Sequence, residues 1–307
     1  MPPGRGAGRL ETTLITMPDL VPQHYTTEFA MNWIQRTQQT KARLDAFVVD
    51  ESFNGERKRW NRLAAQNSRL RTERKGPTVV SEASSDLRWA YNKSYDLANT
   101  LDRDDAQNLG NLVLPTSDYV ASHAAAYNRD KDDAAWTAAL NPAMTGENGT
   151  GSVVLPPSQQ IAAGGTGLTM VKLLQANEIL EGADLEDESP RVLCVTAQQL
   201  TNLLNSVEVK SADYNTVKAL VNGQIDSFMG FKFVKIKRLT KVTTTRSCVG
   251  WVKGAIKRFL GERFSDISKR SDLSYATQIY SAWSFGAVRV YDEGVVQIDC
   301  TEGAFGA

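Results

Sequence analysis

The chain has 307 residues, of which 41% are hydrophobic and 23% charged, and this composition predicts a folded globular protein with a sizeable core. Its 35 Lys and Arg residues balance its 35 Asp and Glu residues. A protein that holds nucleic acid over its whole surface is normally basic, so the balance argues against that class. It also permits many copies to pack without long-range repulsion.

Two further classes are disfavoured by the sequence. No run approaches the ~20 apolar residues of a membrane-spanning helix, so we expect no membrane partner. The first nine residues, rich in Gly, Pro and Arg, lack the apolar stretch of a secretory signal, and we expect folding in a cytoplasm.

The three cysteines (Cys194, Cys248 and Cys300) are far apart in the sequence. Cys194 and Cys300 lie in apolar runs and are expected to be core residues rather than disulfide partners.

Residues 1–40 begin with a polar stretch and continue with scattered large apolar side chains. Phe29 and Trp33 lie at helical spacing, which predicts a short helix. The segment as a whole is typical of an arm that docks on another surface.

Residues 41–111 are polar, with a basic cluster from Arg57 to Lys75 and few apolar residues, most of them aromatic. Such a segment could not bury a core of its own, yet its aromatics would be poorly placed on a solvated loop. We therefore predict a long extended hairpin that lies against a partner surface. A disordered linker is the alternative, disfavoured because the ends of the segment are poor in Gly and Ser.

A long helix is predicted from about residue 116 to 141. Thr116 or Ser117 can cap its first amide groups after a proline, and Asn141-Pro142 ends it. A narrow, Ala-rich apolar stripe runs along it beside a charged belt at residues 129–133. At 1.5 Å per residue the helix would be about 37 Å long, which suits a strut better than a core helix.

The second half alternates helices and strands irregularly, which predicts a mixed α+β body. A helix is expected over residues 168–181, and strands over 191–195, 230–236 and 248–252. At the end of the chain, alternating apolar residues from 286 to 300 predict a half-buried β-hairpin, with Gly294 supplying the positive φ of its turn.

No constellation of catalytic residues is evident. The only two histidines, His24 and His123, have no Cys, His or carboxylate partners at ligand spacing, so both are expected to be structural. No nucleophile elbow, phosphate-binding loop or zinc-protease motif occurs. We expect no enzymatic activity, no cofactor and no metal site.

The basic cluster has two interpretations. Its side chains could contact the phosphates of a nucleic acid, helped by stacking on Trp60. Alternatively, they could pair with carboxylates on a neighbouring copy, such as Asp130, Asp132 and Asp133. The equal supply of carboxylates favours the second interpretation and leaves the first open.

Three segments, taken with the order of the predicted elements, resemble the major capsid proteins of tailed bacteriophages, which have the Hong Kong 97-type fold. They are Tyr127-Asn-Arg-Asp-Lys-Asp132 in the long helix, Gly230-Phe-Lys-Phe-Val234, and residues 286–298. The resemblance implies an α+β fold with an N-terminal arm (1–40) and an extended E-loop (41–111). A peripheral domain (112–195) would contain the spine helix at about 116–141, followed by an axial domain (196–255) and a return to the peripheral domain with the terminal strands (256–307).

The resemblance implies a structural function. Many copies would form the hexamers and pentamers of an icosahedral shell that encloses double-stranded DNA, held without sequence specificity. The expected location is the virion, after assembly in the bacterial cytoplasm with a portal and decoration proteins as further partners. The segment before the E-loop is short for a built-in scaffold, so a separate scaffolding protein is expected. An encapsulin-type shell and a basic-loop nucleic-acid-binding protein are the alternatives.

Aromatic and arginine side chains concentrate interface energy, and opposite charges guide pairing. The residues expected to contact neighbouring copies are Phe29, Trp33, Phe53, Arg57, Arg59, Trp60, Arg62, Arg71, Arg74, Trp89, Asp130, Asp132 and Asp133.

Overall fold

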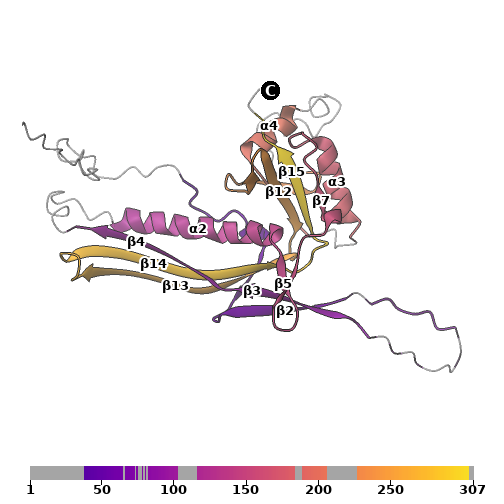
Figure 1. The fold of residues 1–307 in the computed structure, drawn as a ribbon, viewed down its shortest axis with the longest axis horizontal. Helices are drawn as coiled ribbons and strands as arrows, with labels where there is room; N and C mark the ends of the chain where they lie inside the picture. The colour runs from indigo at the N-terminus through magenta and orange to yellow at the C-terminus, as the bar shows by residue number, and fades with distance from the viewer. Residues whose placement is uncertain are drawn as a thin grey trace, which may run out of the picture.

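The computed structural model describes residues 38–64, 66–72, 74, 78, 80, 82–102, 116–183, 189–205 and 227–303. The helix predicted around Phe29 and Trp33 lies outside these residues, as does His24. Figure 1 shows an elongated body of long strands under one long helix, a compact body at one end of it, and a narrow hairpin that projects beyond both.

The elongated body is a four-stranded sheet covered by helix α2 (Thr116–Leu140), which confirms the predicted long helix. Small residues on the buried face of the helix, among them Ala125, Ala135 and Ala139, let it lie close to the strands. Tyr127 packs edge-on against Trp283 with ring centroids 5.8 Å apart. The strands, in sheet order, are β1 (Val49–Ser52), β13 (Ile256–Arg270), β14 (Ala276–Arg289) and β4 (Lys93–Leu101).

The compact body is built on a seven-stranded sheet flanked by α3 (Met170–Glu181) and α4 (Ala197–Asn205). Its core is apolar and includes all three cysteines, which are buried and free, as predicted for Cys194 and Cys300. Its strands are β7 (Gln160–Ile161), β15 (Val295–Thr301), β12 (Thr245–Val252), β8 (Arg191–Val195), β10 (Phe231–Lys235) and β9 (Ser227–Phe228), with β11 (Lys241–Val242) paired to β12.

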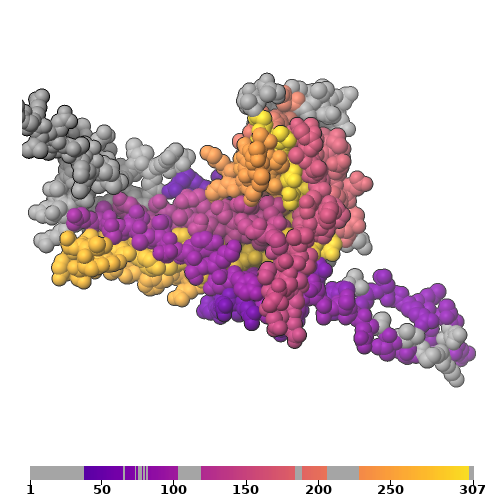
Figure 2. Space-filling view, in the orientation of Figure 1, coloured from indigo at the N-terminus to yellow at the C-terminus, as the bar shows by residue number. Residues whose placement is uncertain are grey.

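A third sheet forms the base of the projecting hairpin. Its order is β2 (Arg57–Leu63), β3 (Ser85–Tyr91), β5 (Ala143–Thr145) and β6 (Gly151–Val153). The amide of Ala64 donates to the carbonyl of Ser84 at 2.9 Å, and the described residues between 66 and 82 lie beyond that bond, at the tip of the hairpin. In Figure 2 the tip extends away from the rest of the molecule. The extended hairpin therefore spans fewer residues than the predicted 41–111, because β1 and β4 belong to the sheet under α2.

The predicted C-terminal hairpin is wrong. β14 pairs with β13 and β4 in the elongated body, whereas β15 pairs with β12 and β7 in the compact body. Residues 290–294 carry the chain between the two bodies, and Gly294 does not adopt a positive φ. Alternating apolar residues correctly indicated two half-buried strands, but alternation does not say which sheet buries each of them.

Candidate assembly site

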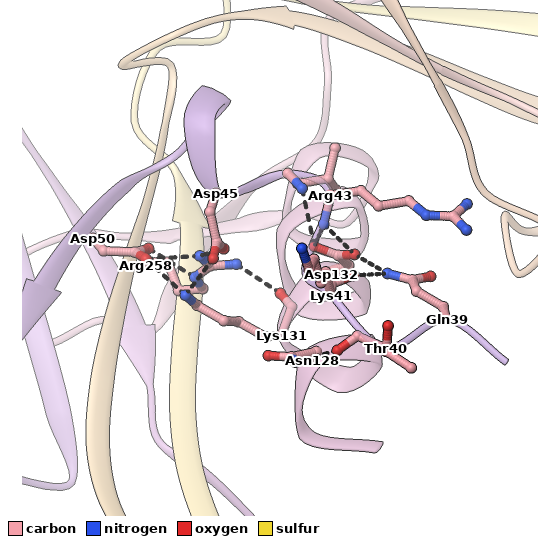
Figure 3. Close-up of polar contacts among 11 residues, drawn as sticks. Gln39, Thr40, Lys41, Arg43, Asp45, Asp50, Asn128, Lys131, Asp132 and Arg258 are labelled. Carbon is pink, nitrogen blue, oxygen red and sulfur yellow. Dashed lines mark hydrogen bonds and ion pairs between the residues drawn. The ribbon is translucent and has the colours of Figure 1, made fainter. Parts of the chain in front are cut away.

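Residues 39–44 are fastened to helix α2 by one buried carboxylate. Asp132 accepts hydrogen bonds from the amides of Arg43, at 2.9 and 3.1 Å, and Leu44, at 3.1 Å (Figure 3). The side-chain amide of Gln39 donates to the same carboxylate at 2.5 Å. Burial raises the pKa of Asp132 despite these donors. These bonds hold residues 39–44 against the helix.

Contacts on either side extend this attachment along the helix. The side-chain amide of Asn128 donates to the carbonyl of Thr40 at 2.7 Å, and the Arg129 guanidinium donates to the side chain of Gln38 at 2.7 Å. Asp133 accepts two hydrogen bonds from Arg238 Nε, at 2.7 and 2.9 Å. Helix α2 thereby holds both residues 38–44 and a loop of the compact body.

A second network joins α2 to the sheet beneath it. Arg258 on β13 is fully buried and bonds Asp45 and Asp50 at 2.8 Å, while its Nη1 donates to the carbonyl of Lys131 (Figure 3). The Lys131 ammonium lies 3.0 and 3.1 Å from the same two carboxylates. Burial alone would raise the pKa of Asp45, but hydrogen bonds from Lys131 and Arg258 outweigh it and lower the pKa. Two cations and two carboxylates are thus neutralised together.

The hairpin base is anchored at the other end of the helix. Arg289, which is fully buried, donates to the carbonyls of Ala139 and Asn141 at the C-terminus of α2 and to Asp292 at 2.6 Å. Asp292 also accepts from Arg88 of β3 at 2.7 Å. A guanidinium suits carbonyls at a helix C-terminus, where the helix dipole is negative. The hairpin base is therefore tied to α2 through one carboxylate.

The aromatics of the hairpin pack on their own chain. Trp60 and Trp89 are only 7% and 9% exposed, and their indole N–H groups donate to Glu51 and to the carbonyl of Gly146. Phe53 lies edge-on to Phe259, with ring centroids 5.5 Å apart. The inference that these aromatics need a partner surface is therefore wrong, because sheets assembled from distant parts of the chain bury them.

The predicted basic and acidic interface residues differ in their surroundings. The predicted arginines are exposed except for Arg62, which is half-buried and lies 3.4 Å from Glu293. Asp132 and Asp133 are bonded within the chain, which removes them as partners for a neighbour's arginines. Asp130 is half-buried, and Phe29 and Trp33 lie outside the described residues. The exposed group is Arg57, Arg59, Arg71 and Arg74.

Sequence reasoning missed the apolar part of the hairpin surface. Leu63, Leu70 and Val80 are 67%, 82% and 82% exposed, and they flank the exposed arginines of the tip. Exposed apolar side chains beside cationic ones are typical of a protein interface. Isolated apolar residues within a polar run were the available signal.

Two features are absent from the described part of the chain. No helix there is long and apolar enough to cross a membrane. No group of three or more His, Cys, Asp or Glu residues there is placed to hold a metal ion. The groups brought together are anchors for projecting segments.

The sequence matches the phage capsid protein family over residues 21–302. The chain belongs to this family. As a member, it is a structural subunit of a phage capsid and a component of the virion. No curated protein sequence is significantly similar to it.

Solved structures show that the fold is the Hong Kong 97-type capsid fold. The cyanophage Pam1 capsid subunit superposes with a TM-score of 0.66 at 8% identity, over 95% of this chain and 100% of that one. The head protein of Helicobacter pylori bacteriophage KHP40 gives 0.65 at 10%, over 96% and 99%. The Mycobacterium phage Che8 protein gives 0.63 at 14%, over 92% and 98%. The α+β prediction is thereby confirmed.

Proposed function

We propose that the chain is the major subunit of an icosahedral shell around the double-stranded DNA of a tailed phage, and that its projecting hairpin binds a neighbouring copy. The observation that carries the proposal is the tip, whose described residues between 66 and 82 extend beyond the body with exposed apolar and arginine side chains (Figure 2). Closed symmetry repeats each such contact many times, so a moderate interface suffices.

The two bodies support a domain assignment. The elongated body with α2 would be the peripheral domain, and the compact body with the seven-stranded sheet the axial domain. The E-loop proper would be residues 57–91, which is shorter than the sequence indicated. The two buried networks on α2 support this assignment, because they hold two segments to one rigid helix. These segments are residues 38–44, from which the N-terminal arm would leave, and the hairpin base.

The carboxylates that receive the tip arginines would lie on a neighbouring copy. Of the three predicted candidates, Asp130 is the one not already bonded to an arginine side chain or to residues 39–44. It faces a cavity of about 310 Å³ whose wall includes Trp89, Tyr95 and Phe285. Burial and the nearby Asp133 raise the pKa of Asp130, as expected for a carboxylate that lacks sufficient compensating charge.

The proposal keeps the further partners expected from the sequence. A separate scaffolding protein, a portal and decoration proteins would complete the particle, whose subunits would form hexamers and pentamers. The role is structural rather than enzymatic. An encapsulin-type compartment has the same fold but encloses protein, so the nucleic-acid content of purified particles distinguishes it from a capsid.

The test is deletion of the tip. Residues 66–82 are removed and Ala65-Ala83 is replaced by Asn-Gly, which makes a two-residue hairpin loop after the Ala64–Ser84 bond. Deleting 53–78 would be unsuitable, because it removes β2 and the buried Trp60. We expect an unchanged melting temperature for the subunit and no closed shells in electron micrographs. Shells of normal size would overturn the proposed role of the hairpin.

A matched control keeps the length of the tip. Changing Arg69, Arg71 and Arg74 to Gln retains the reach of the hairpin but removes its charge. Assembly that weakens without disappearing would assign part of the contact to these arginines. Undiminished assembly would assign it to the apolar side chains.

A further inference from the structure

One buried lysine in the compact body is surrounded by main-chain oxygens. Lys172 is 6% exposed, and its ammonium donates to the carbonyls of Ala163 at 2.7 Å, Thr166 at 3.0 Å, Gly167 at 3.1 Å and Asp299 at 2.9 Å. An ammonium has three N–H bonds, so four acceptors at these distances surround it much as oxygens surround a bound cation.

The position of this charge is unfavourable for the helix itself. Lys172 lies in the first turn of α3, after the N-cap Thr169, where the helix dipole disfavours a cation. Burial lowers the pKa of Lys172 as well. The four carbonyl oxygens therefore supply the stabilisation that keeps the charged form in place.

The oxygens converge because of the backbone between β7 and α3. Gly164 and Gly165 adopt φ values of +54° and +71°, which turn the chain back on itself. At Gly167 a Cβ would lie 2.1 Å from Nδ2 of Asn202 on α4, so a larger residue there would displace that side chain. The fourth oxygen comes from β15, and the amide of Thr301 donates to Thr166 O at 2.8 Å.

We propose that these four carbonyls form a monovalent-cation site that the Lys172 ammonium fills, and that the site binds potassium or ammonium ion when the side chain is shortened. Carbonyl oxygens replace the hydration shell of potassium in the same way elsewhere. The 2.7–3.1 Å distances are too long for magnesium, at about 2.0–2.1 Å, and for calcium, at about 2.3–2.6 Å. In the native chain the Lys172 ammonium is itself the cation, so it joins loop 162–168 to β15 without an ion from solution.

The test compares two substitutions in the full-length chain, in the same assembly state. Lys172→Ala opens the site, whereas Lys172→Met keeps it filled with an uncharged stem. In choline chloride we expect both to lower the melting temperature by roughly 5 °C or more. At equal ionic strength, KCl and NH4Cl should restore several degrees to Lys172→Ala, NaCl less, and none of them should restore Lys172→Met. Lys253→Ala, at an exposed position, controls for general salt effects.

Two results would overturn the proposal. One is a Lys172→Met chain as stable as the unmodified protein, since the ammonium would then contribute nothing. The other is equal stabilisation of Lys172→Ala by choline, sodium and potassium, which would reduce the effect to ionic strength. If Lys172→Ala does not fold in choline chloride, its refolding yield in KCl or NH4Cl is the readout, and equal yields in all four salts count against the site.

Discussion

At the scale of single residues, two buried carboxylates show how the surroundings decide the cost of a charge. Asp132 is bonded by amide groups, and burial raises its pKa. Glu302 is also buried, yet hydrogen bonds from Arg246 and Lys241 outweigh that burial and lower its pKa to about 2. Its Oε1 additionally accepts from Thr196 and Gln199 at 3.3 Å, so one carboxylate joins β15, β12 and the start of α4.

Glu302 predicts a dependence of stability on pH. Its folded-state pKa of about 2 lies below the ordinary value of 4.5, so its contribution is complete above pH 4.5 and is lost as the pH falls toward 2. The difference corresponds to at most about 3 kcal/mol at neutral pH. Glu302→Gln should lower the melting temperature at pH 7, and the gap to the unmodified chain should close between pH 4.5 and 2. A gap that stays constant over that range would contradict the assignment.

Asp132 predicts a contrast between two substitutions. Asp132→Ala leaves the buried amides of Arg43 and Leu44 without an acceptor and should cost about 2–4 kcal/mol in urea unfolding. Asp132→Asn should cost less, because Gln39 can turn its own amide to accept from the new one. Proteolysis within residues 38–44 should accelerate in the alanine variant. Asp96→Ala, at an exposed position on β4, is the control, and equal stability of the two alanine variants would contradict the anchor.

At the scale of elements, local signals were read correctly and long-range pairings were not. The length of α2 followed from its caps and its apolar stripe, and β8, β10 and β12 followed from short apolar runs. The partners of β14 and β15 could not be predicted, since they belong to two sheets whose other strands come from distant segments. The burial of Trp60 and Trp89 was missed for the same reason, because β5 and β13 complete their surroundings.

The junction at the end of α2 predicts strong coupling between two residues. Arg289→Met leaves the buried Asp292 with Arg88 at 2.7 Å and the more distant Arg62 at 4.0 Å, and it removes the donor from the carbonyls at the helix end, which should cost about 3–5 kcal/mol. In a double-mutant cycle with Asp292→Asn, the double variant should lose at least about 1 kcal/mol less than the sum of the singles. The exposed pair Arg270 and Asp272 provides the matched control and should show no measurable coupling. Additivity at the buried pair would contradict the junction.

At the scale of the whole molecule, the rigid parts and the projecting parts are distinct. Helix α2 carries buried networks at residues 38–44 and at the hairpin base, whereas the tip exposes its apolar and cationic side chains. Fixed bases let a projecting segment reach a neighbour in a defined direction and lower the entropy lost on binding. The zero net charge fits shells whose subunits bind one another rather than a nucleic acid.

This charge balance predicts that shells form through contacts between proteins, without nucleic acid. The chain, produced with a scaffolding protein but without packaging genes, should form closed particles whose 260/280 nm absorbance ratio is that of protein. Nuclease treatment before assembly should not reduce their yield, because the tip arginines would pair with carboxylates of neighbouring copies. Raised salt weakens contacts to carboxylates and to phosphates alike, so it does not distinguish the two kinds of partner. Particles that form only when nucleic acid is added, or that always contain it in fixed proportion, would instead assign the basic tip to phosphate binding.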